Sequence, residues 1–580
     1  MGEIMKLTTE QETIIAAAKE MVAGDIIKID AAAGAAKTST LVFIAEAISE
    51  PSICLVFNKA AQIDADERFP AHVLCKTTHS LAYSAIGHLY SSKLSRPQGG
   101  YVNVLGTGSE IAKHFRIEPF VWPNGKDLPA AFLGLLIRNT VNRFEQSADL
   151  KITVSNLPDV LTQITEKSCS GVGKLKKDIV TFAEKLWKLR TDLSSDVLAT
   201  HDTYLKLYHL SNPKLPYKII YADEFQDANP CVVDILSKQN AKVVIVGDQF
   251  QAIYGWRGAV NALKDTIGKE FKLSTSFRYG QDSADLASKV LEDKVSIKSH
   301  TGLHTEIGED VVDKTKPYTI LYRTNQALVL DAVKCIQDGL SVNIEIDVRD
   351  FCNLLTSAVA LYRGELNKVK HEELLCFNNF GELKEEAEGN GAFNRLVNII
   401  ETGKSNKVLN ALNFHKNSRN ALITFTTAHK AKGREWKQVE LADDFPLHIK
   451  GGEWVGLSQE EQNLLYVATT RAIEKMNLNK SLKEIWVRDL MDKPKESKEF
   501  IEESKIALKE IEKGLFTPYM RRADRGVPDG AFLALERAEI ESEQAEAHYN
   551  MEISNEEAYD LGILDEMGYA NYNLSDLTPH

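Results

Sequence analysis

The stretch from Lys218 to Gly258 constrains the fold more than any other part of the sequence. An apolar run after Lys218 ends in two adjacent carboxylates, Asp223 and Glu224, and a second apolar run ends at Asp248. Continuous apolar runs of this length predict strands of a parallel sheet that is buried on both faces. Their carboxylates would lie at the C-terminal edge of that sheet, where open α/β proteins bind ligands. We therefore predict an α/β fold with a ligand site at this edge.

The residues around the acid pair suit nucleotide chemistry. The first acid would hold Mg²⁺, and the second would act on an attacking water. Gln251, Tyr254, Trp256 and Arg257 follow the second apolar run at once. The alternative is that the acids only cap the next helix, since carboxylates favour helix N-termini. The cluster that begins at Gln251 favours a nucleotide motor.

A loop of small residues near the N-terminus is a candidate phosphate site. Residues 25–30 predict a strand, and Ala31–Ala36 leads from it to Lys37 and Thr38 at a helix start. Backbone N–H groups of such a loop face phosphate, while the lysine adds charge and the threonine reaches Mg²⁺. The strict pattern has glycine at positions 31 and 36. If position 36 needs φ > 0, a Cβ there costs on the order of 1 kcal/mol. An alanine-rich helix start without a nucleotide is the alternative.

Length and charge set limits on the class of protein. The 580 residues predict about three to five domains. No run of about 18 apolar residues exists, and the start lacks a signal-peptide core, so we expect a soluble intracellular protein without membrane contact, cytoplasmic or nucleoid-associated, or nuclear in a eukaryote. Seven cysteines without Cys-x-x-Cys spacing argue against a zinc site. The net charge is −13, but the segment 536–580 is strongly acidic, so the main body is near neutral and could carry a basic groove.

Polar residues follow other predicted strands as well. Asn58 and Lys59 follow one apolar run, and Thr77 and His79 follow the next. Because parallel strands end at one sheet edge, a nucleic-acid strand could lie there against donors and cations. Each of these residues could equally cap the helix that follows. The same design recurs later in the chain with Arg323, Asn325 and His429.

Composition and periodicity divide the chain into five parts. We expect two α/β motor domains, each interrupted by a mostly helical insertion, and then a C-terminal extension. The predicted boundaries are 1–86 with 217–280 for the first motor domain, 87–216 for its insertion, 281–345 with 421–483 for the second motor domain, 346–420 for its insertion, and 484–580 for the extension with its acidic tail.

These blocks, in this order, resemble the superfamily 1A helicases, the group typified by the UvrD-type motor. The resemblance runs from Thr8 to about Leu478 and implies two RecA-like P-loop NTPase domains. Because an F-box would precede the motor, which begins here at Thr8, we expect no F-box and no ubiquitin-ligase role. Within the group, the F-box DNA helicases are most similar in the segments 57–59, 68–70, 75–83, 427–433 and 442–445.

The resemblance implies ATP and Mg²⁺ as cofactors, with a role for each matching residue. Gln11 would read adenine, Phe277 would stack on the base, and Glu435 would bind the ribose. The phosphates would meet the loop residues Gly34, Ala35, Ala36, Lys37, Thr38 and Ser39. The metal would meet Thr38, Asp223 and Glu224, and Glu224 would also activate water. Three residues would sense the γ-phosphate: Gln251, Arg278 and Arg471. Arg471 would point outward from a helix over 460–472 and act as an arginine finger.

The resemblance also implies a DNA track. Trp256 would stack on a base, which contributes about 1–3 kcal/mol without requiring a sequence. The remaining DNA-binding residues implied are Asn58, Lys59, Thr77, His79, Tyr254, Arg257, Arg323, Asn325 and His429.

The activity that follows is ATP-driven 3′ to 5′ translocation and unwinding by a monomer on single-stranded DNA and at junctions, in replication, recombination or repair. One alternative is a translocase that strips proteins from single strands with little unwinding. Another is a nucleotide-gated DNA-binding scaffold with negligible hydrolysis. The acidic tail is interpreted as a flexible end, or as a mimic of single-stranded DNA that docks on the motor or recruits a protein partner.

Overall fold

A computed structural model describes residues 7–94, 105–121, 127–159, 171–253, 261–388, 390–418, 420–450 and 453–491. The described chain forms two compact units. The larger unit holds described residues up to 306, then 310–446 and 457–479, and the smaller holds 307–309, 447–456 and 480–491. No helix in these ranges is long and apolar enough to cross a membrane.

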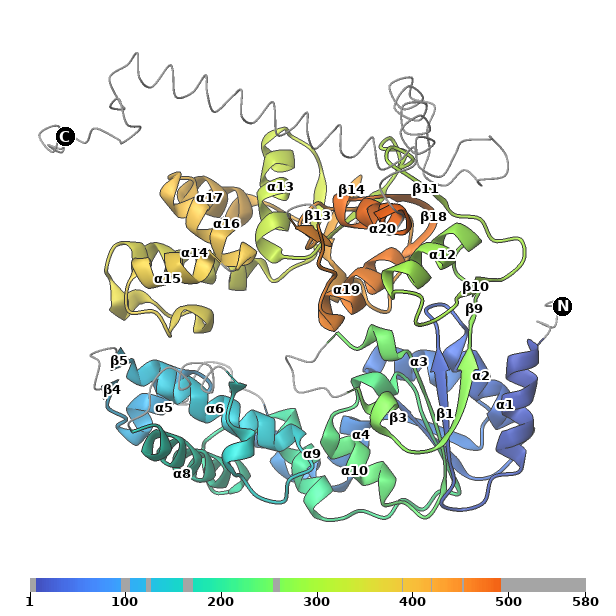
Figure 1. Ribbon diagram of the computed structural model, residues 1–580. Helices are drawn as coiled ribbons and strands as arrows, with labels where there is room; N and C mark the ends of the chain where they lie inside the picture. Colours follow the sequence, from blue (N-terminus) through green and yellow to red (C-terminus); the bar gives the residue numbers. More distant parts are fainter. Residues whose placement is uncertain are drawn as a thin grey trace, which may run out of the picture. The chain divides into compact units, whose positions relative to one another are not determined.

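The first sheet of the larger unit is parallel throughout. Its strands come from two stretches of sequence, and each run of apolar residues predicted in the acid-bearing stretch forms a buried strand. The strand order is β3 (Val73–Thr77), β2 (Ser52–Val56), β6 (Ile219–Ala222), β7 (Lys242–Gly247), β1 (Ile26–Ala31) and β8 (Lys269–Leu273). The predicted parallel α/β class is therefore confirmed (Figure 1).

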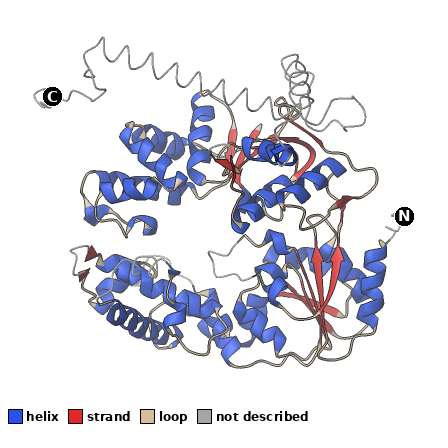
Figure 2. Cartoon of the chain, viewed as in Figure 1, coloured by secondary structure: helices blue, strands red, loops and turns tan. Residues whose placement is uncertain are grey.

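Helices lie on either side of these strands (Figure 2). Local sequence fixes where several of them begin. Thr8 forms a capping box with Gln11 at the start of α1. Asn58 caps α3 and Thr77 caps α4, and each of these helices follows a strand. The helices are α1 (Thr9–Lys19), α2 (Lys37–Ala47), α3 (Lys59–Arg68), α4 (Thr78–Ala85), α10 (Pro230–Ser237), α11 (Ala262–Asp265) and α12 (Gln281–Val290), with 3₁₀ turns at Phe225–Asp227 and Gln249–Gln251.

A second parallel sheet follows later in the chain. Its strands that lie wholly in the larger unit are, in spatial order, β18 (Ala472–Asn477), β15 (Trp436–Leu441), β12 (Tyr318–Tyr322), β14 (Ile423–Thr427) and β13 (Val342–Ile344). Its helices are α13 (Asn325–Gln337), α18 (Ala428–Ala431) and α19 (Gln459–Thr469). A short parallel pair, β9 (Thr275–Ser276) and β10 (Lys298–Ser299), lies between the two sheets in sequence.

The two stretches predicted as insertions are mainly helical. The first contains α5 (Gly108–Phe115), α6 (Ala130–Gln146), α8 (Val172–Thr191) and α9 (His201–Leu210), the strands β4 (Phe120–Val121) and β5 (Asp127–Leu128), and 3₁₀ turns at Gly87–Lys93 and Val154–Asn156. The second contains α14 (Val348–Tyr362), α15 (Phe380–Ala387), α16 (Gly391–Glu401) and α17 (Ser405–Phe414), with 3₁₀ turns at Leu366–Lys368 and Glu372–Leu374.

The smaller unit has its own local structure. The antiparallel pair β16 (Ile449–Lys450) and β17 (Glu453–Trp454) precedes α20 (Lys480–Met491) in sequence. The Glu484 carboxylate of α20 accepts hydrogen bonds from the backbone N–H groups of His448 and Ile449. β11 (Glu306–Gly308) spans the boundary between the units. The acidic tail that carries the DNA-mimic hypothesis lies outside the described residues.

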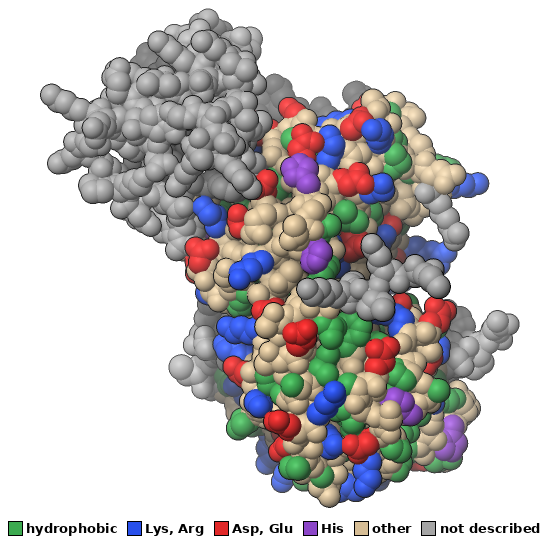
Figure 3. Space-filling view, turned by 90° about the vertical axis from the view of Figure 1, so that its right-hand side faces the viewer, with side chains coloured by type: hydrophobic (Ala, Val, Ile, Leu, Met, Phe, Trp, Pro, Cys, Tyr) green, Lys and Arg blue, Asp and Glu red, His purple; other side chains and the backbone are tan. Residues whose placement is uncertain are grey.

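The basic groove that a near-neutral main body could carry is not visible on the one face that Figure 3 shows. Lysine and arginine side chains are interspersed there with aspartate and glutamate side chains. Mixed charge on this face agrees with a main body that is close to neutral in total charge.

Two glycines allow α5 and α6 to cross at very close range. A Cβ placed on Gly134 would lie 2.0 Å from the carbonyl oxygen of Gly108, and one on Gly108 would lie 2.2 Å from the carbonyl oxygen of Ala131. Both obstacles are backbone atoms, so neither can rotate away. Any side chain at either position would force the two helices apart.

We expect Gly134→Ala to lower the free energy of unfolding by about 1–3 kcal/mol, the usual cost of overpacking. Helix propensity alone would act in the opposite direction, by about 1 kcal/mol. The matched control is Gly173→Ala in α8, where no atom lies within 4 Å of the new Cβ. Urea or thermal unfolding measures both, and equal stability of the two variants would contradict the close crossing.

Candidate functional site

The loop from β1 to α2 contains two residues in the left-handed backbone region, Gly34 and Ala36. Ala36 has φ 56° and ψ 41°, in the left-handed region. The condition set out for position 36 is therefore met, and its Cβ costs on the order of 1 kcal/mol. Gly34 has φ 76°, and a Cβ there would lie 2.6 Å from Ser276 Oγ. Position 34 therefore requires glycine. Position 36 would favour glycine by its backbone conformation, but it carries alanine in this sequence.

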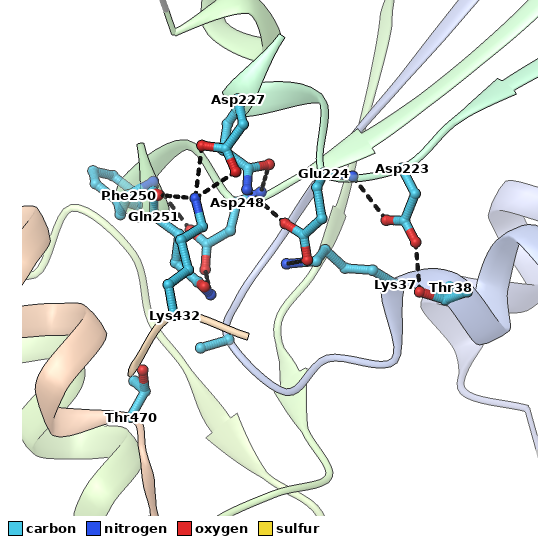
Figure 4. Close-up of polar contacts among 12 residues, drawn as sticks. Lys37, Thr38, Asp223, Glu224, Asp227, Asp248, Phe250, Gln251, Lys432 and Thr470 are labelled. Carbon is cyan, nitrogen blue, oxygen red and sulfur yellow. Dashed lines mark hydrogen bonds and ion pairs between the residues drawn. The ribbon is translucent and has the colours of Figure 1, made fainter. Parts of the chain in front are cut away.

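Four predicted residues meet at the start of α2 (Figure 4). Lys37 Nζ lies 3.2 Å from Glu224 Oε1, and Thr38 Oγ1 donates a hydrogen bond of 2.5 Å to Asp223 Oδ2. The carboxylates follow β6 directly, and the lysine and threonine begin α2. The sheet edge therefore joins the phosphate loop to the acid pair.

The two acids of the pair have opposite pKa shifts. Burial raises the pKa of Asp223 to about 6, and the charge of Glu224 adds to the shift. Burial also opposes charge on Glu224, but the cations of Lys37 and Lys432 outweigh it and lower its pKa to about 2. The Thr38 hydroxyl and the Asp223 carboxylate lie side by side. Both offer oxygen atoms, the ligands that Mg²⁺ prefers. The residues present fit that ion.

A third carboxylate, Asp248, lies beside the acid pair. Gln251 Nε2 donates to Asp248 Oδ2 at 2.7 Å, so the predicted γ-phosphate sensor is held next to this acid. Gln226 links the two strand ends, because its Nε2 donates to Glu224 Oε2 at 2.6 Å while its Oε1 accepts from Asp248 N at 3.0 Å. Burial raises the pKa of Asp248 to about 6.

Residues between strands of the second sheet reach this edge of the first. Lys432 Nζ donates to both carboxylate oxygens of Asp227, at 2.7 and 2.6 Å, and to the Gln251 carbonyl oxygen at 2.5 Å. Asn463 Nδ2 of α19 donates to the Ala252 carbonyl oxygen at 3.0 Å. Burial raises the pKa of Asp227 to about 6 although Lys432 opposes the shift. Sequence analysis assigned no role to Lys432, Asn463 or Asp227.

The two predicted arginines have different partners. Arg278 Nε donates to Glu435 Oε2 at 2.5 Å, so the residue predicted to bind ribose is paired with an arginine. Arg471 does not point outward from a helix as predicted, because α19 ends at Thr469. Its buried guanidinium folds back and donates to the Val467 carbonyl oxygen at 2.7 Å.

Arg471 is a buried cation without a carboxylate partner among the described residues. Its other bonds go to the Arg434 carbonyl oxygen at 3.2 Å and to Thr470 Oγ1 at 2.8 Å. Burial lowers its pKa to about 9, and the charge of Arg278 contributes to the shift. An anion at this position would relieve both effects.

The residues predicted to contact adenine have partners within the protein. Gln11 is buried, with its Nε2 donating to Thr40 Oγ1 at 3.1 Å and its Oε1 accepting from Thr8 N at 3.0 Å. The Phe277 ring stacks on His300, with ring centroids 4.8 Å apart. The roles of Gln11 and Phe277 toward a base stay predictions.

Several predicted DNA-binding residues act as helix caps or ion-pair partners. Asn58 Oδ1 accepts from Ala61 N at 2.8 Å, and Thr77 Oγ1 accepts from Ser80 N at 3.0 Å, which is the capping alternative set out above. Other contacts are Lys59 Nζ to Gln62 Oε1 at 3.2 Å, His79 Nε2 to Asp202 Oδ1 at 3.0 Å, and Arg323 Nη2 to Glu461 Oε1 at 2.6 Å.

The remaining DNA-binding predictions are placed less fully. Asn325 is the first residue of α13, and His429 lies in α18. Tyr254, Trp256 and Arg257 lie outside the described residues. Contact between any of these residues and DNA stays a prediction.

Comparison with known proteins places these features in context. The family model for the UvrD/REP helicase N-terminal domain matches residues 138–272. F-box DNA helicase protein 1 of Schizosaccharomyces pombe is 30% identical over 526 residues, covering 83% of this chain and 58% of the relative. F-box DNA helicase 1 of Gallus gallus is 30% identical, with 83% and 50% covered. DNA helicase II of Escherichia coli is 24% identical, with 50% and 42% covered. The chain spans about half the length of these relatives, and the predicted resemblance is confirmed.

We expect Ala36→Gly to leave the free energy of unfolding within about 0.5 kcal/mol of wild type, because relief of the left-handed strain offsets the added entropy of the unfolded chain. The control is Ala45→Gly, at a buried alanine inside α2, which should lose about 1 kcal/mol or more. Chemical denaturation compares them. A loss at position 36 as large as that at position 45 would contradict the left-handed conformation.

We expect the Mg²⁺-dependent part of nucleotide affinity to fall as pH drops through about 6, the pKa of Asp223. The metal binds the ionised carboxylate, so protonation competes by about tenfold for each pH unit below that pKa. Titration of a non-hydrolysable ATP analogue with Mg²⁺ measures this, and the same series in EDTA corrects for protonation of the nucleotide. The gain in affinity that Mg²⁺ gives over EDTA is the quantity to compare. If this gain stays constant across the pH range, or persists in Asp223→Asn, Asp223 is not a ligand of the metal.

Proposed function

We propose that this UvrD-like relative of the superfamily 1A helicases hydrolyses ATP and uses the cycle to move 3′ to 5′ along single-stranded DNA, opening duplexes at junctions. The observation that carries the proposal is the meeting of Lys37 and Thr38 with Asp223 and Glu224 at one sheet edge. ATP hydrolysis needs a loop that binds the phosphates, an acid that binds the metal ion and a second, ionised acid that acts on water. The residues at this edge could fill all three roles.

The ATP site would work through a change of partner by Lys37. Mg²⁺, held by Thr38 and Asp223, would neutralise charge on the phosphates. Lys37 now contacts Glu224, and the phosphates would draw the lysine toward themselves. Glu224 would then lose the cation that lowers its pKa, and a more basic carboxylate is better able to orient and deprotonate water. Nucleotide binding itself would activate the base.

The arginines would act on the charge that develops at the γ-phosphate. Arg471 is buried beside Arg278 with only neutral acceptors, so phosphate oxygens would supply the missing negative charge. Arg278 would move from Glu435 to the phosphates, which frees Glu435 for the ribose. Removing one such arginine in phosphoryl transfer costs on the order of 10³-fold or more in rate.

Movement along DNA would follow from opening and closing between the two sheets. Lys432 and Asn463 already connect elements of the second sheet to the acid edge of the first. Loss of the γ-phosphate would weaken this attraction and release one grip on the strand. Backbone contacts would come from the strand-end residues Thr77, His79, Arg323, Asn325 and His429, with base stacking by Trp256.

The setting of this activity belongs to the same proposal. We place it inside the cell, at the chromosome, in replication, recombination or repair, and we expect the motor to act as a monomer. The acidic tail is proposed to recruit a protein partner or to compete with DNA for the motor.

The left-handed Ala36 favours a second candidate function. Strain in the phosphate loop would slow ATP turnover, which suits a nucleotide-gated scaffold that binds DNA with negligible hydrolysis. If the site is only slowed by Ala36, the change Ala36→Gly should raise turnover. If the site has no turnover for another reason, Ala36→Gly should leave it inactive.

We expect single-stranded DNA to stimulate steady-state ATP hydrolysis, and expect Lys37→Ala and Glu224→Gln each to reduce it by about 10²-fold or more. The control is Lys316→Ala, which removes an exposed lysine and should change turnover less than twofold, about the scatter of such measurements. Normal turnover in either site variant would refute the assignment. DNA binding without hydrolysis in the wild type would favour the scaffold.

A further inference from the structure

One tyrosine hydroxyl from α19 is inserted between the phosphate loop and the acid edge. Tyr466 is 1% exposed. Its hydroxyl accepts a hydrogen bond of 2.9 Å from the backbone N–H of Ala33 and donates one of 3.0 Å to Asp248 Oδ2. Ala33 and Asp248 follow β1 and β7, which are neighbours in the first sheet. A side chain from a helix of the second sheet therefore touches two of the segments that build the proposed ATP site.

The direction of these hydrogen bonds is fixed by chemistry. A backbone N–H can only donate, and an ionised carboxylate can only accept, so the single hydroxyl proton of Tyr466 must point to Asp248. The lone pairs of the hydroxyl then face Ala33. The arrangement is a polarised chain from the loop amide through Tyr466 to the carboxylate, in which each bond strengthens the next.

The Ala33 amide and the Asp248 carboxylate would each lose a hydrogen-bond partner without the Tyr466 hydroxyl. Asp248 is 1% exposed. Its Oδ1 accepts from Phe250 N at 3.0 Å, and its Oδ2 is shared between Gln251 Nε2 at 2.7 Å and Tyr466. Removal of the hydroxyl would leave the Ala33 amide without this acceptor and Asp248 with one donor fewer. Both groups are buried, where an unpaired polar atom is costly.

The same helix makes a second contact with the segment after β7, and Arg471 follows its C-terminal end. Asn463, one turn before Tyr466, donates to the Ala252 carbonyl oxygen, and Arg471 follows the helix end and bonds to the Val467 carbonyl oxygen. The position of α19 therefore sets the position of Arg471. We infer that Tyr466 is a positioning residue: its hydroxyl seats α19 on the phosphate loop, so that Arg471 reaches the γ-phosphate only when the loop is in its phosphate-binding conformation.

This inference rests on the proposed ATPase and adds a coupling to it. Tyr466 does not touch the reacting atoms in this role. It links the shape of the phosphate loop to the placement of the arginine. Its loss should therefore lower the rate of the chemical step more than the affinity for nucleotide, because Lys37 and the loop amides still bind phosphate.

The test is Tyr466→Phe, which removes the hydroxyl and keeps the ring. We expect kcat for DNA-stimulated ATP hydrolysis to fall by about tenfold or more while KM for ATP changes by less than about threefold. The matched control is Tyr90→Phe, which removes a hydroxyl that donates to the Thr191 carbonyl oxygen at 2.9 Å, in a residue 7% exposed. This control should keep kcat within about twofold.

A second measurement does not depend on turnover. Hydrogen exchange of the Ala33 amide should speed up by about tenfold in Tyr466→Phe relative to wild type, both with a bound non-hydrolysable ATP analogue, and should not change in Tyr90→Phe. If Tyr466→Phe does not fold, Asp248→Asn provides the same readouts and should change them in the same direction.

The outcomes separate the two proposals. Unchanged kcat in Tyr466→Phe, an equal loss of kcat in Tyr90→Phe, or unchanged exchange at Ala33 would each overturn the positioning role. A wild-type protein without ATP hydrolysis would overturn the proposed function instead. In that case hydrogen exchange of the Ala33 amide would still test the contact between Tyr466 and the phosphate loop, because it does not require turnover.

Discussion

The crowding of buried carboxylates at one edge of the first sheet is the constraint on which the rest of the site depends. Three of them have pKa values raised to about 6 by burial, and the fourth is held at about 2 by nearby cations: Asp223, Asp227, Asp248 and Glu224. Among the described residues, two lysines, Lys37 and Lys432, form ion pairs with this group. Four acids against two lysines leave an excess of negative charge, which a divalent cation would balance. In the ATPase proposed here, Mg²⁺ bound together with the nucleotide would offset part of this charge.

The same excess of charge explains why residues from the second sheet reach this edge. A buried acid requires cations or hydrogen-bond donors, and the first sheet does not supply enough of them. Lys432 and Tyr466 add an ammonium and a hydroxyl to these acids from segments that connect strands of the second sheet. These contacts would respond to a nucleotide bound at this edge, because its phosphates would compete with the acids for Lys37 and Lys432. Electrostatics at the acid edge would thus link nucleotide state to domain contact.

Much of this arrangement could be predicted from local sequence, because its signals are short in range. The apolar runs that end in acids, the small-residue loop before Lys37, and the caps at Thr8, Asn58 and Thr77 each depend on neighbouring residues. The orientation of Arg471 could not be predicted, since it depends on where α19 ends and which carbonyl groups are then free.

The contacts made by Lys432 and Tyr466 join residues about two hundred to four hundred positions apart. Periodicity cannot specify such pairs, because many lysines and tyrosines are equally compatible with the pattern. The only available signal was that both residues lie within blocks that resemble helicase motifs. Long-range polar contacts therefore mark the limit of what the residues alone could establish.

The caps found at the strand ends are compatible with the proposed DNA contacts, because the helix ends that they cap would still attract phosphate. Asn58, Thr77 and Thr324 each follow a strand and cap the helix that comes next, α3, α4 or α13. A cap satisfies one or two of the first N–H groups and leaves others at a helix end that carries partial positive charge. Such an end attracts phosphate without reading a base. The repeated order of strand, cap and helix would give the motor a row of sequence-independent phosphate contacts, even though the capping side chains themselves are already bonded within the protein.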